Sequence, residues 1–227
     1  LSGALVLNNT KEKVIFENGI NHNSVMEIYN FTRRFNTTLN AVSKHAFISP
    51  EINFYTTCEA IENRLPFEVK NFEELKQGNI YKINLINEDK KVQEEMSGFF
   101  KKEALVSLEI EEKKDYKKNL FGNLDFIPED FKNKYSIMKT TPYTLEVIHK
   151  DTNKGIALEK LANYLGIKRE EIIAIGDSGN DEHMIEYAGL GIAMGNAFKS
   201  IKEKADFITL TNQEDGVANA INKFILN

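Results

Sequence analysis

Residues 172–181 read Ile-Ile-Ala-Ile-Gly-Asp-Ser-Gly-Asn-Asp, an apolar run that leads into two aspartates separated by small polar residues. The apolar run predicts a buried strand at residues 172–176, and the polar residues after it predict a turn into a helix. In open α/β sheets, ligands bind at the carboxyl ends of strands, where such loops lie. We therefore expect this loop to carry function.

Around the loop, the last third of the chain alternates between amphipathic helical patterns and short apolar runs. This alternation predicts a parallel sheet with helices on its faces, which is an α/β architecture. The expected helices span residues 155–165, 181–188, 197–204 and 214–226, and the expected strands span residues 172–176, 190–194 and 206–209. A further strand is expected at residues 1–7.

The middle of the chain has a different pattern, in which candidate strands and helices are mixed without regular alternation. It predicts a separate α+β unit with a largely antiparallel sheet, inserted at residues 20–149 between core segments 1–19 and 150–227. Its expected strands are residues 47–48, 80–86, 105–110, 124–127 and 144–148, and its expected helices are residues 24–35, 71–76 and 90–101.

The composition argues against several classes of protein. The 227 residues are 41% hydrophobic and 28% charged, with a net charge of -5 and dispersed basic residues, so a nucleic-acid partner is not expected. The apolar runs are too short to span a bilayer, so no membrane segment is expected. The single Cys58 is expected to be a free structural thiol, and the lack of a signal peptide favours a cytoplasmic location. Nothing in the sequence sets an oligomeric state.

The two aspartates of the loop have the chemistry of a metal site. Asp177 directly follows the predicted strand, and Asp181 falls in the first turn of the predicted helix. Carboxylate oxygens suit Mg²⁺, while Ser178 and Gly179 allow a tight turn whose N–H groups favour an anion. The alternative is that one of the aspartates caps the helix, and the residues alone leave both readings open.

The motifs together resemble those of the haloacid dehalogenase (HAD) superfamily, in particular its Cof-type, subfamily IIB phosphatases. Gly176-Asp177-Ser178-Gly179-Asn180-Asp181 is similar to the fourth motif of that family, and Asn153-Lys154-Gly155 is similar to the third. Residues 191–197 and 205–209 resemble the closing strands, and Ser2-Gly3-Ala4 resembles an Asn-Gly-Ala segment. The resemblance implies a Rossmann-like parallel-sheet core, incomplete at its amino-terminal side, with an inserted α+β cap domain.

The same resemblance assigns roles to individual residues. Lys154 would bind the transferring phosphoryl group, although a lone lysine at a helix start is otherwise a surface residue. Asp177 would be a direct Mg²⁺ ligand, and Asp181 would be a ligand or would fix the waters of the metal. Asn180 and Ser178 would bind substrate phosphate. Asn196 is a weaker candidate for support of the loop, because Gly-Asn-Ala is also an ordinary turn.

The implied activity is Mg²⁺-dependent hydrolysis of small phosphorylated metabolites, such as sugar phosphates, through an aspartyl phosphate. The first family motif, Asp-x-Asp-Gly-Thr, carries the nucleophile, and no aspartate here has another two positions later. The second motif is also missing, because no Gly-Arg pair occurs. We expect both motifs upstream of Leu1, so that the 227 residues alone are inactive. The alternative is a phosphometabolite-binding protein without turnover.

Overall fold

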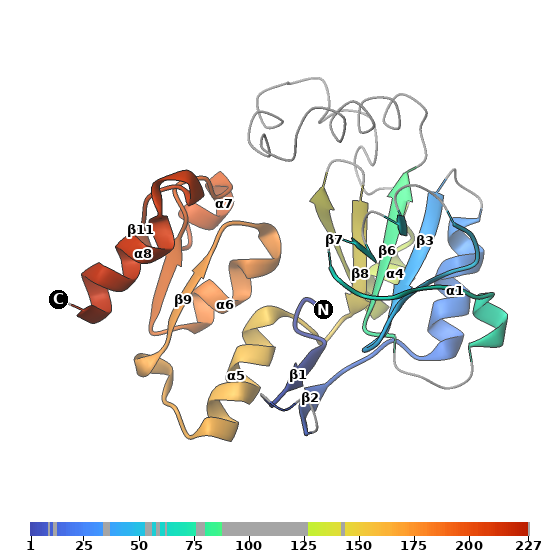
Figure 1. Cartoon of the computed structure of the whole chain (residues 1–227), viewed down its shortest axis with the longest axis horizontal. Coiled ribbons are helices and arrows are strands. Elements are labelled where there is room, and N and C mark those ends of the chain that lie inside the picture. Colours follow the sequence, from blue (N-terminus) through green and yellow to red (C-terminus); the bar gives the residue numbers. More distant parts are fainter. Residues whose placement is uncertain are drawn as a thin grey trace. The chain divides into compact units, whose positions relative to one another are not determined.

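A computed structural model describes residues 1–8, 10, 13–33, 37–52, 56–57, 60–61, 63–75, 80–87, 127–141 and 144–226 (Figure 1). The chain forms two compact units, one of residues 1–19 with 151–227 and one of residues 20–150. The predicted helix 90–101, the predicted strand 105–110, residues 124–126 and Cys58 lie outside the described residues.

The first unit contains a parallel sheet of three strands in the order β11-β10-β9. β9 (Ile173–Gly176) pairs with β10 (Leu190–Ala193), and β10 pairs with β11 (Phe207–Ile208). These strands fall within the three predicted runs, and both pairs are parallel. The expected α/β class is therefore confirmed for this unit.

Helices connect these strands and cover them (Figure 1). α5 (Lys154–Leu165) begins after Asn153, whose Oδ1 accepts from Ile156 N at 2.8 Å, and ends at Gly166 with φ of 71°. The remaining helical segments are η4 (Arg169–Glu171), η5 (Gly179–Asp181), α6 (Glu182–Tyr187), α7 (Lys199–Lys202), η6 (Asn212–Glu214), α8 (Gly216–Ile221) and the π-helix η7 (Asn222–Leu226). The helix predicted at residues 181–188 is therefore divided between the end of η5 and α6. The helix predicted at residues 214–226 is divided among the end of η6, α8 and η7.

The amino-terminal segment differs from its prediction. Its strand, β1, covers Leu5–Leu7 and pairs antiparallel with the unpredicted β2 (Val14–Glu17). The first residues form a turn instead, because Ser2 and Gly3 have φ of 50° and 93°, which are incompatible with an extended strand. The prediction that a strand begins at Leu1 is therefore wrong.

The second unit is a six-stranded sheet in the order β5-β4-β3-β6-β8-β7. Four of its five strand pairs are antiparallel and the β4–β5 pair is parallel, which confirms the expected largely antiparallel sheet. Its elements are α1 (His22–Thr32), β3 (Thr37–Val42), β4 (Phe47–Ser49), β5 (Phe67–Val69), η1 (Phe72–Glu74), β6 (Lys82–Asn87), α4 (Glu129–Lys134), β7 (Tyr135–Thr141) and β8 (Thr144–His149).

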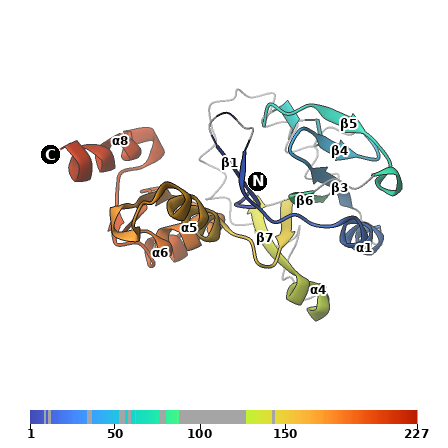
Figure 2. The same cartoon turned by 90° about the horizontal axis from the view of Figure 1, so that it is seen from below.

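The larger apolar cluster of this unit lies on one face of the sheet. Figure 2 shows α1 and α4 on the same side, and their side chains Phe31 and Phe131 have ring centroids 4.9 Å apart. Alternate residues of the central strands point into this core, because side chains alternate between the faces of a strand. These strand residues include Leu39, Ala41, Ile83, Leu85, Leu145 and Val147.

Glu27 links α1 to β7 and gives a pH-dependent prediction. Its carboxylate accepts from Lys134 Nζ at 2.6 Å and Tyr135 Oη at 2.9 Å. The Lys134 hydrogen bond, helped by Tyr135, lowers the pKa of Glu27 despite partial burial. A lowered folded-state pKa stabilises the fold above the ordinary pKa, and this contribution is lost as the pH falls through the folded value. Glu27→Gln should cost about 1 kcal/mol or less at about pH 7, and the cost should shrink as the pH falls below the ordinary pKa of a glutamate, measured by urea unfolding.

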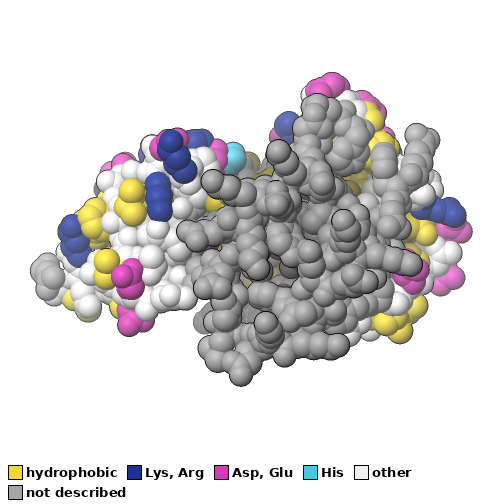
Figure 3. All heavy atoms as spheres, turned by 90° about the horizontal axis from the view of Figure 1, so that it is seen from above, with side chains coloured by type: hydrophobic (Ala, Val, Ile, Leu, Met, Phe, Trp, Pro, Cys, Tyr) yellow, Lys and Arg dark blue, Asp and Glu magenta, His cyan; other side chains and the backbone are white. Residues whose placement is uncertain are grey.

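Within the part of the chain that the structure describes, no helix has the length and apolar character needed to cross a membrane. On the face shown in Figure 3, the described Lys and Arg side chains of the first unit are scattered among acidic, polar and apolar ones. They form no continuous basic stripe on the described part of that face.

Candidate active site at the end of β9

The candidate site begins where β9 ends and the chain turns into η5. Met194 N donates to Gly176 O at 2.9 Å, and Phe198 N donates to Asp177 O at 3.1 Å. The backbone of the loop is therefore held by the segment that follows β10. This fixes the starting position of the Asp177 side chain at the carboxyl end of the strand.

Asp181 closes the loop from inside. Its Oδ2 accepts from Asp177 N at 3.0 Å and from Ser178 N at 3.1 Å, and the residue is 5% exposed. A Cβ on Gly176 would lie 2.4 Å from Asp181 Cβ, so glycine is required for the side chain to fold back here. The capping alternative is thus partly correct for Asp181, which accepts backbone N–H groups at the start of η5.

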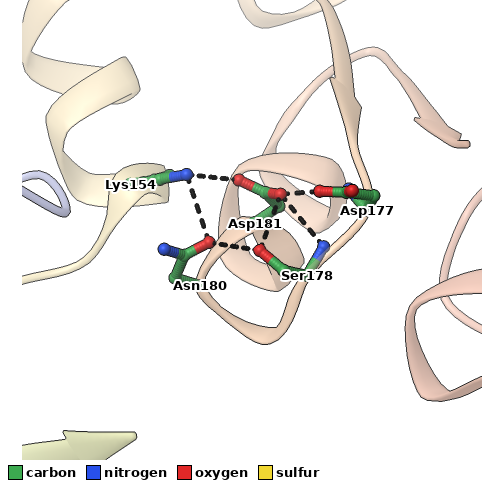
Figure 4. A network of polar contacts seen from close by, with 5 residues as sticks. All are labelled: Lys154, Asp177, Ser178, Asn180 and Asp181. Atoms are coloured by element: carbon green, nitrogen blue, oxygen red, sulfur yellow. Dashed lines mark hydrogen bonds and ion pairs between the residues drawn. The ribbon is translucent and has the colours of Figure 1, made fainter. Parts of the chain in front are cut away.

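Lys154 reaches the same carboxylate from the start of α5. Its Nζ lies 2.5 Å from Asp181 Oδ1 and 3.1 Å from Asn180 Oδ1 (Figure 4). Close packing of two helices makes this possible, because a Cβ on Gly155 would lie 2.5 Å from His183 O in α6. The third and fourth motif segments, far apart in the sequence, therefore meet at one carboxylate.

Asn180 and Ser178 complete the network. Ser178 Oγ donates to Asn180 Oδ1 at 2.7 Å, so this oxygen accepts from both Ser178 and Lys154. In Figure 4 the amide nitrogen of Asn180 points away from these contacts. The arrangement leaves the Asn180 N–H groups directed outward, whereas the Ser178 hydroxyl is engaged within the loop.

The Asp177 side chain has different surroundings from that of Asp181. Among the described residues, the donor to its carboxylate is Asn196, whose Nδ2 lies 3.2 Å from Asp177 Oδ2. Asn196 is held in turn by Asn212 N, which donates to its Oδ1 at 2.9 Å. The structure thus places the weaker sequence candidate, Asn196, directly beside Asp177.

The electrostatics of the site favour an ionised Asp181. Burial by itself raises the pKa of this carboxyl, but hydrogen bonds from Lys154 and from the N–H groups of Asp177 and Ser178 outweigh it. The net effect lowers the pKa below its ordinary value. Asp181 is therefore a fixed negative charge that orients the Lys154 ammonium.

The sequence analysis missed a close contact behind Lys154. A Cβ on Gly3 would lie 2.3 Å from Asn153 O and 2.9 Å from Lys154 N, so the Ser2–Gly3 turn abuts the peptide that precedes Lys154. Asn18 Nδ2 also donates to Asp151 O at 3.0 Å. The β1–β2 segment therefore braces the backbone from which Lys154 projects. The glycine of Ser2-Gly3-Ala4 was the available signal.

The donor set fits Mg²⁺ at Asp177 better than at Asp181. The two oxygens of Asp181 already accept from Lys154 and from two N–H groups, which leaves little capacity for direct coordination. The exposed Asp177 offers a carboxylate, and Mg²⁺ takes one or two carboxylates with several waters and phosphate oxygens. In the described residues, no three His, Cys, Asp or Glu side chains gather as a metal site.

Comparison with known proteins bears directly on this site. The model of the haloacid dehalogenase-like hydrolase family matches residues 1–221. The chain belongs to this family. Over 228 residues it is 29% identical to YxeH of Bacillus subtilis (strain 168), whose name ascribes phosphatase activity, and the match covers 99% of this chain and 74% of YxeH.

Two further matches extend the comparison. Over 96 residues the chain is 50% identical to YcsE of Bacillus subtilis (strain 168), which is named a 5-amino-6-(5-phospho-D-ribitylamino)uracil phosphatase. This match covers 42% of this chain and 39% of YcsE. A crystal structure of a HAD-like hydrolase from Bacteroides thetaiotaomicron has a TM-score of 0.72 and 27% identity, over 99% of this chain and 74% of that one. The predicted family, fold class and enzyme class, a phosphoric monoester hydrolase, are confirmed.

Proposed function

We propose that this HAD-family chain supplies the phosphate-binding and Mg²⁺-binding part of a phosphatase that acts on small phosphorylated metabolites. One observation carries the proposal: the Lys154 ammonium lies 2.5 Å from Asp181 and 3.1 Å from Asn180, next to the loop that bears Asp177. A fixed cation, outward amide N–H groups and an exposed carboxylate are what a phosphate dianion with a divalent ion requires. Residues 20–150 are proposed as the cap.

The proposed roles follow from these contacts. Lys154 binds the phosphoryl oxygens and offsets their charge, and Asp181 holds the ammonium in position. Asn180 donates to the phosphate from its outward N–H groups, and Asp177 holds Mg²⁺ with support from Asn196. Bound Mg²⁺ would polarise the phosphoryl oxygens and reduce their repulsion of a nucleophile.

The proposed chemistry is nucleophilic catalysis by an aspartate. Its carboxylate attacks phosphorus, the bond to the leaving oxygen breaks, and water then hydrolyses the aspartyl phosphate to release phosphate. The 227 residues contain no Asp-x-Asp pair, so the proposal does not assign the nucleophile to any of them. The same observation favours a second candidate, a protein that binds phosphometabolites without turnover.

Asp177→Asn tests the metal part of the proposal. The asparagine can still accept from Asn196 but loses the charge that Mg²⁺ needs, so we expect kcat/KM to fall by about 10²–10³. The measurement is p-nitrophenyl phosphate hydrolysis, with and without chelator, by protein expressed from the complete reading frame. Asp206→Asn is a control outside the site, because Asp206 accepts from Gly191 N at 2.8 Å in the sheet.

Activity that survives both chelation and Asp177→Asn would contradict the Mg²⁺ assignment. Phosphate binding by the parent protein without any hydrolysis would instead support the binding protein. The two candidate functions therefore give different results in one set of measurements.

A further inference from the structure

The closing turn, residues 211–214, follows β11 and is held by one carboxylate. Glu214 Oε2 accepts from Thr211 Oγ1 at 2.7 Å and from Thr211 N at 3.2 Å. In return, Glu214 N donates to Thr211 O at 3.1 Å, which completes a capping box. These bonds fix the backbone of the short helix η6. The N–H group of Asn212, within this turn, therefore has a set direction.

The closing turn lies against the segment that follows β10. A Cβ on Gly195 would lie 2.7 Å from Thr211 N, so the two backbones are in close contact. Next to this contact, Asn212 N donates to Asn196 Oδ1 at 2.9 Å. Because the amide oxygen of Asn196 faces the turn, its amide nitrogen faces Asp177, and Nδ2 lies 3.2 Å from Asp177 Oδ2. The turn thus determines which end of the Asn196 amide meets the aspartate.

One oxygen of Asp177 is thereby engaged by a protein donor. Asn196 donates to Oδ2, which leaves Oδ1 as the oxygen through which this carboxylate can coordinate a metal. Ca²⁺ takes carboxylates through one or both oxygens in a flexible shell, whereas Mg²⁺ requires near-octahedral geometry and keeps several waters. A carboxylate restricted to one oxygen suits Mg²⁺ and removes a binding mode that Ca²⁺ uses.

We propose that the closing turn, acting through Asn196, holds Asp177 as a one-oxygen metal ligand and so favours Mg²⁺ over Ca²⁺. Glu214 is then a positioning residue for the metal site, although it touches neither metal nor substrate. This inference rests on the proposed function, which assigns the metal to Asp177. It adds the feature of the chain that discriminates between the two ions.

Asn196→Ala and Glu214→Ala test the inference at two distances from the metal. Asn196→Ala removes the donor to Asp177 Oδ2 and frees that oxygen. Glu214→Ala leaves Asn196 in place but removes the acceptor that closes the turn. The N–H group of Asn212 then loses its fixed direction, and the Asn196 amide loses its orientation.

Glu171→Ala is the matched control for Glu214→Ala. Glu171 Oε2 accepts from Lys168 N at 2.9 Å, and Glu171 N donates to Lys168 O at 3.0 Å, so this glutamate closes η4 in the same way. Both glutamates are exposed, but η4 precedes β9 and lies at the opposite end of that strand from Asp177. The two variants should lower the melting temperature by similar amounts.

The measurement is isothermal titration of MgCl₂ and of CaCl₂, each alone, into protein expressed from the complete reading frame. We expect Asn196→Ala to weaken Mg²⁺ binding by about tenfold and Ca²⁺ binding by about twofold or less, because the freed Oδ2 becomes available to Ca²⁺. Glu214→Ala should shift the ratio of the two dissociation constants in the same direction by about twofold or more. Glu171→Ala should keep the parent ratio, since a loss of stability alone does not distinguish the ions.

The possible results separate this inference from the proposed function. If the parent binds Mg²⁺ and Asn196→Ala keeps the parent ratio, the inference is overturned while the Mg²⁺ assignment stands. A shift in Asn196→Ala that is absent in Glu214→Ala overturns the role of the closing turn. Mg²⁺ binding that is unchanged by Asp177→Asn contradicts the proposed metal site and the inference together.

Discussion

Lys154→Met is expected to lower kcat/KM for phosphorylated substrates by about 10²–10³, because it removes a positioned cation from a phosphoryl-transfer site. Methionine keeps much of the apolar stem but lacks the ammonium that lies 2.5 Å from Asp181 Oδ1 and 3.1 Å from Asn180 Oδ1. The measurement is steady-state kinetics with p-nitrophenyl phosphate, using protein expressed from the complete reading frame.

Lys160→Met is the matched control for this substitution. Lys160 is exposed on the same helix, α5, so the change removes the same charge from the same element without touching the network. We expect parent-level kinetics for this variant. Parent-level kinetics for Lys154→Met as well would refute the assigned role of the ammonium.

The same substitution also separates stability from chemistry. Without Lys154, the Asp181 carboxylate stays buried with two backbone N–H donors but without its cation, which should destabilise the fold by about 1–3 kcal/mol. The double variant Lys154→Met, Asp181→Asn removes the unpaired charge, so urea unfolding should show recovered stability. Its activity should remain low. Recovery of both properties together would mean that Lys154 acts through stability alone.

The sequence was sufficient to predict the elements around the site because their signals are local. An apolar run followed by Gly-Asp-Ser-Gly-Asn-Asp indicates a strand, a turn and a helix start within ten or so neighbouring residues. Asn153 likewise marks the start of α5 by capping it. The site residues were predicted from these elements together with the resemblance of their motifs to the motifs of the family.

The strands that were missed depend on partners distant in the sequence. β3 (Thr37–Val42) carries Thr38 and Asn40 on its buried polar face, so it lacks the clear apolar alternation of a half-exposed strand. β1 was predicted too long for a related reason. Ser2 and Gly3 have positive φ angles, and Gly3 lies so close to the Asn153–Lys154 peptide that an added Cβ would be 2.3 Å from Asn153 O. A local apolar pattern contains no information on this distant contact.

The distinction between the two aspartates also required the structure. By sequence, Asp177 and Asp181 are both carboxylates beside a strand end, and either could bind a metal or cap a helix. The difference arises at Gly176, where the absent Cβ makes room for the Asp181 side chain to accept two N–H groups. The space at Gly176 therefore lets Asp181 accept backbone N–H groups and orient Lys154, whereas Asp177 keeps a carboxylate that can coordinate a metal.

Gly3→Ala should destabilise the protein by about 2–5 kcal/mol, which combines a positive-φ penalty with a steric clash. Gly3 has φ of 93°, and an added Cβ would lie 2.3 Å from Asn153 O. Gly166→Ala separates the two effects, because Gly166 has φ of 71° but no atom within 4 Å of an added Cβ. This control should cost about 1–2 kcal/mol in urea unfolding.

The clash at Gly3 should also act on the site, because the peptide that must shift is the one from which Lys154 projects. Displacement of Asn153 weakens its cap, so hydrogen exchange at the Ile156 amide, which donates to Asn153 Oδ1 at 2.8 Å, should be faster in Gly3→Ala. In Gly166→Ala, at the far end of α5, exchange at this amide should match the parent. Equal exchange in both variants would mean that Gly3 contributes to folding without positioning Lys154.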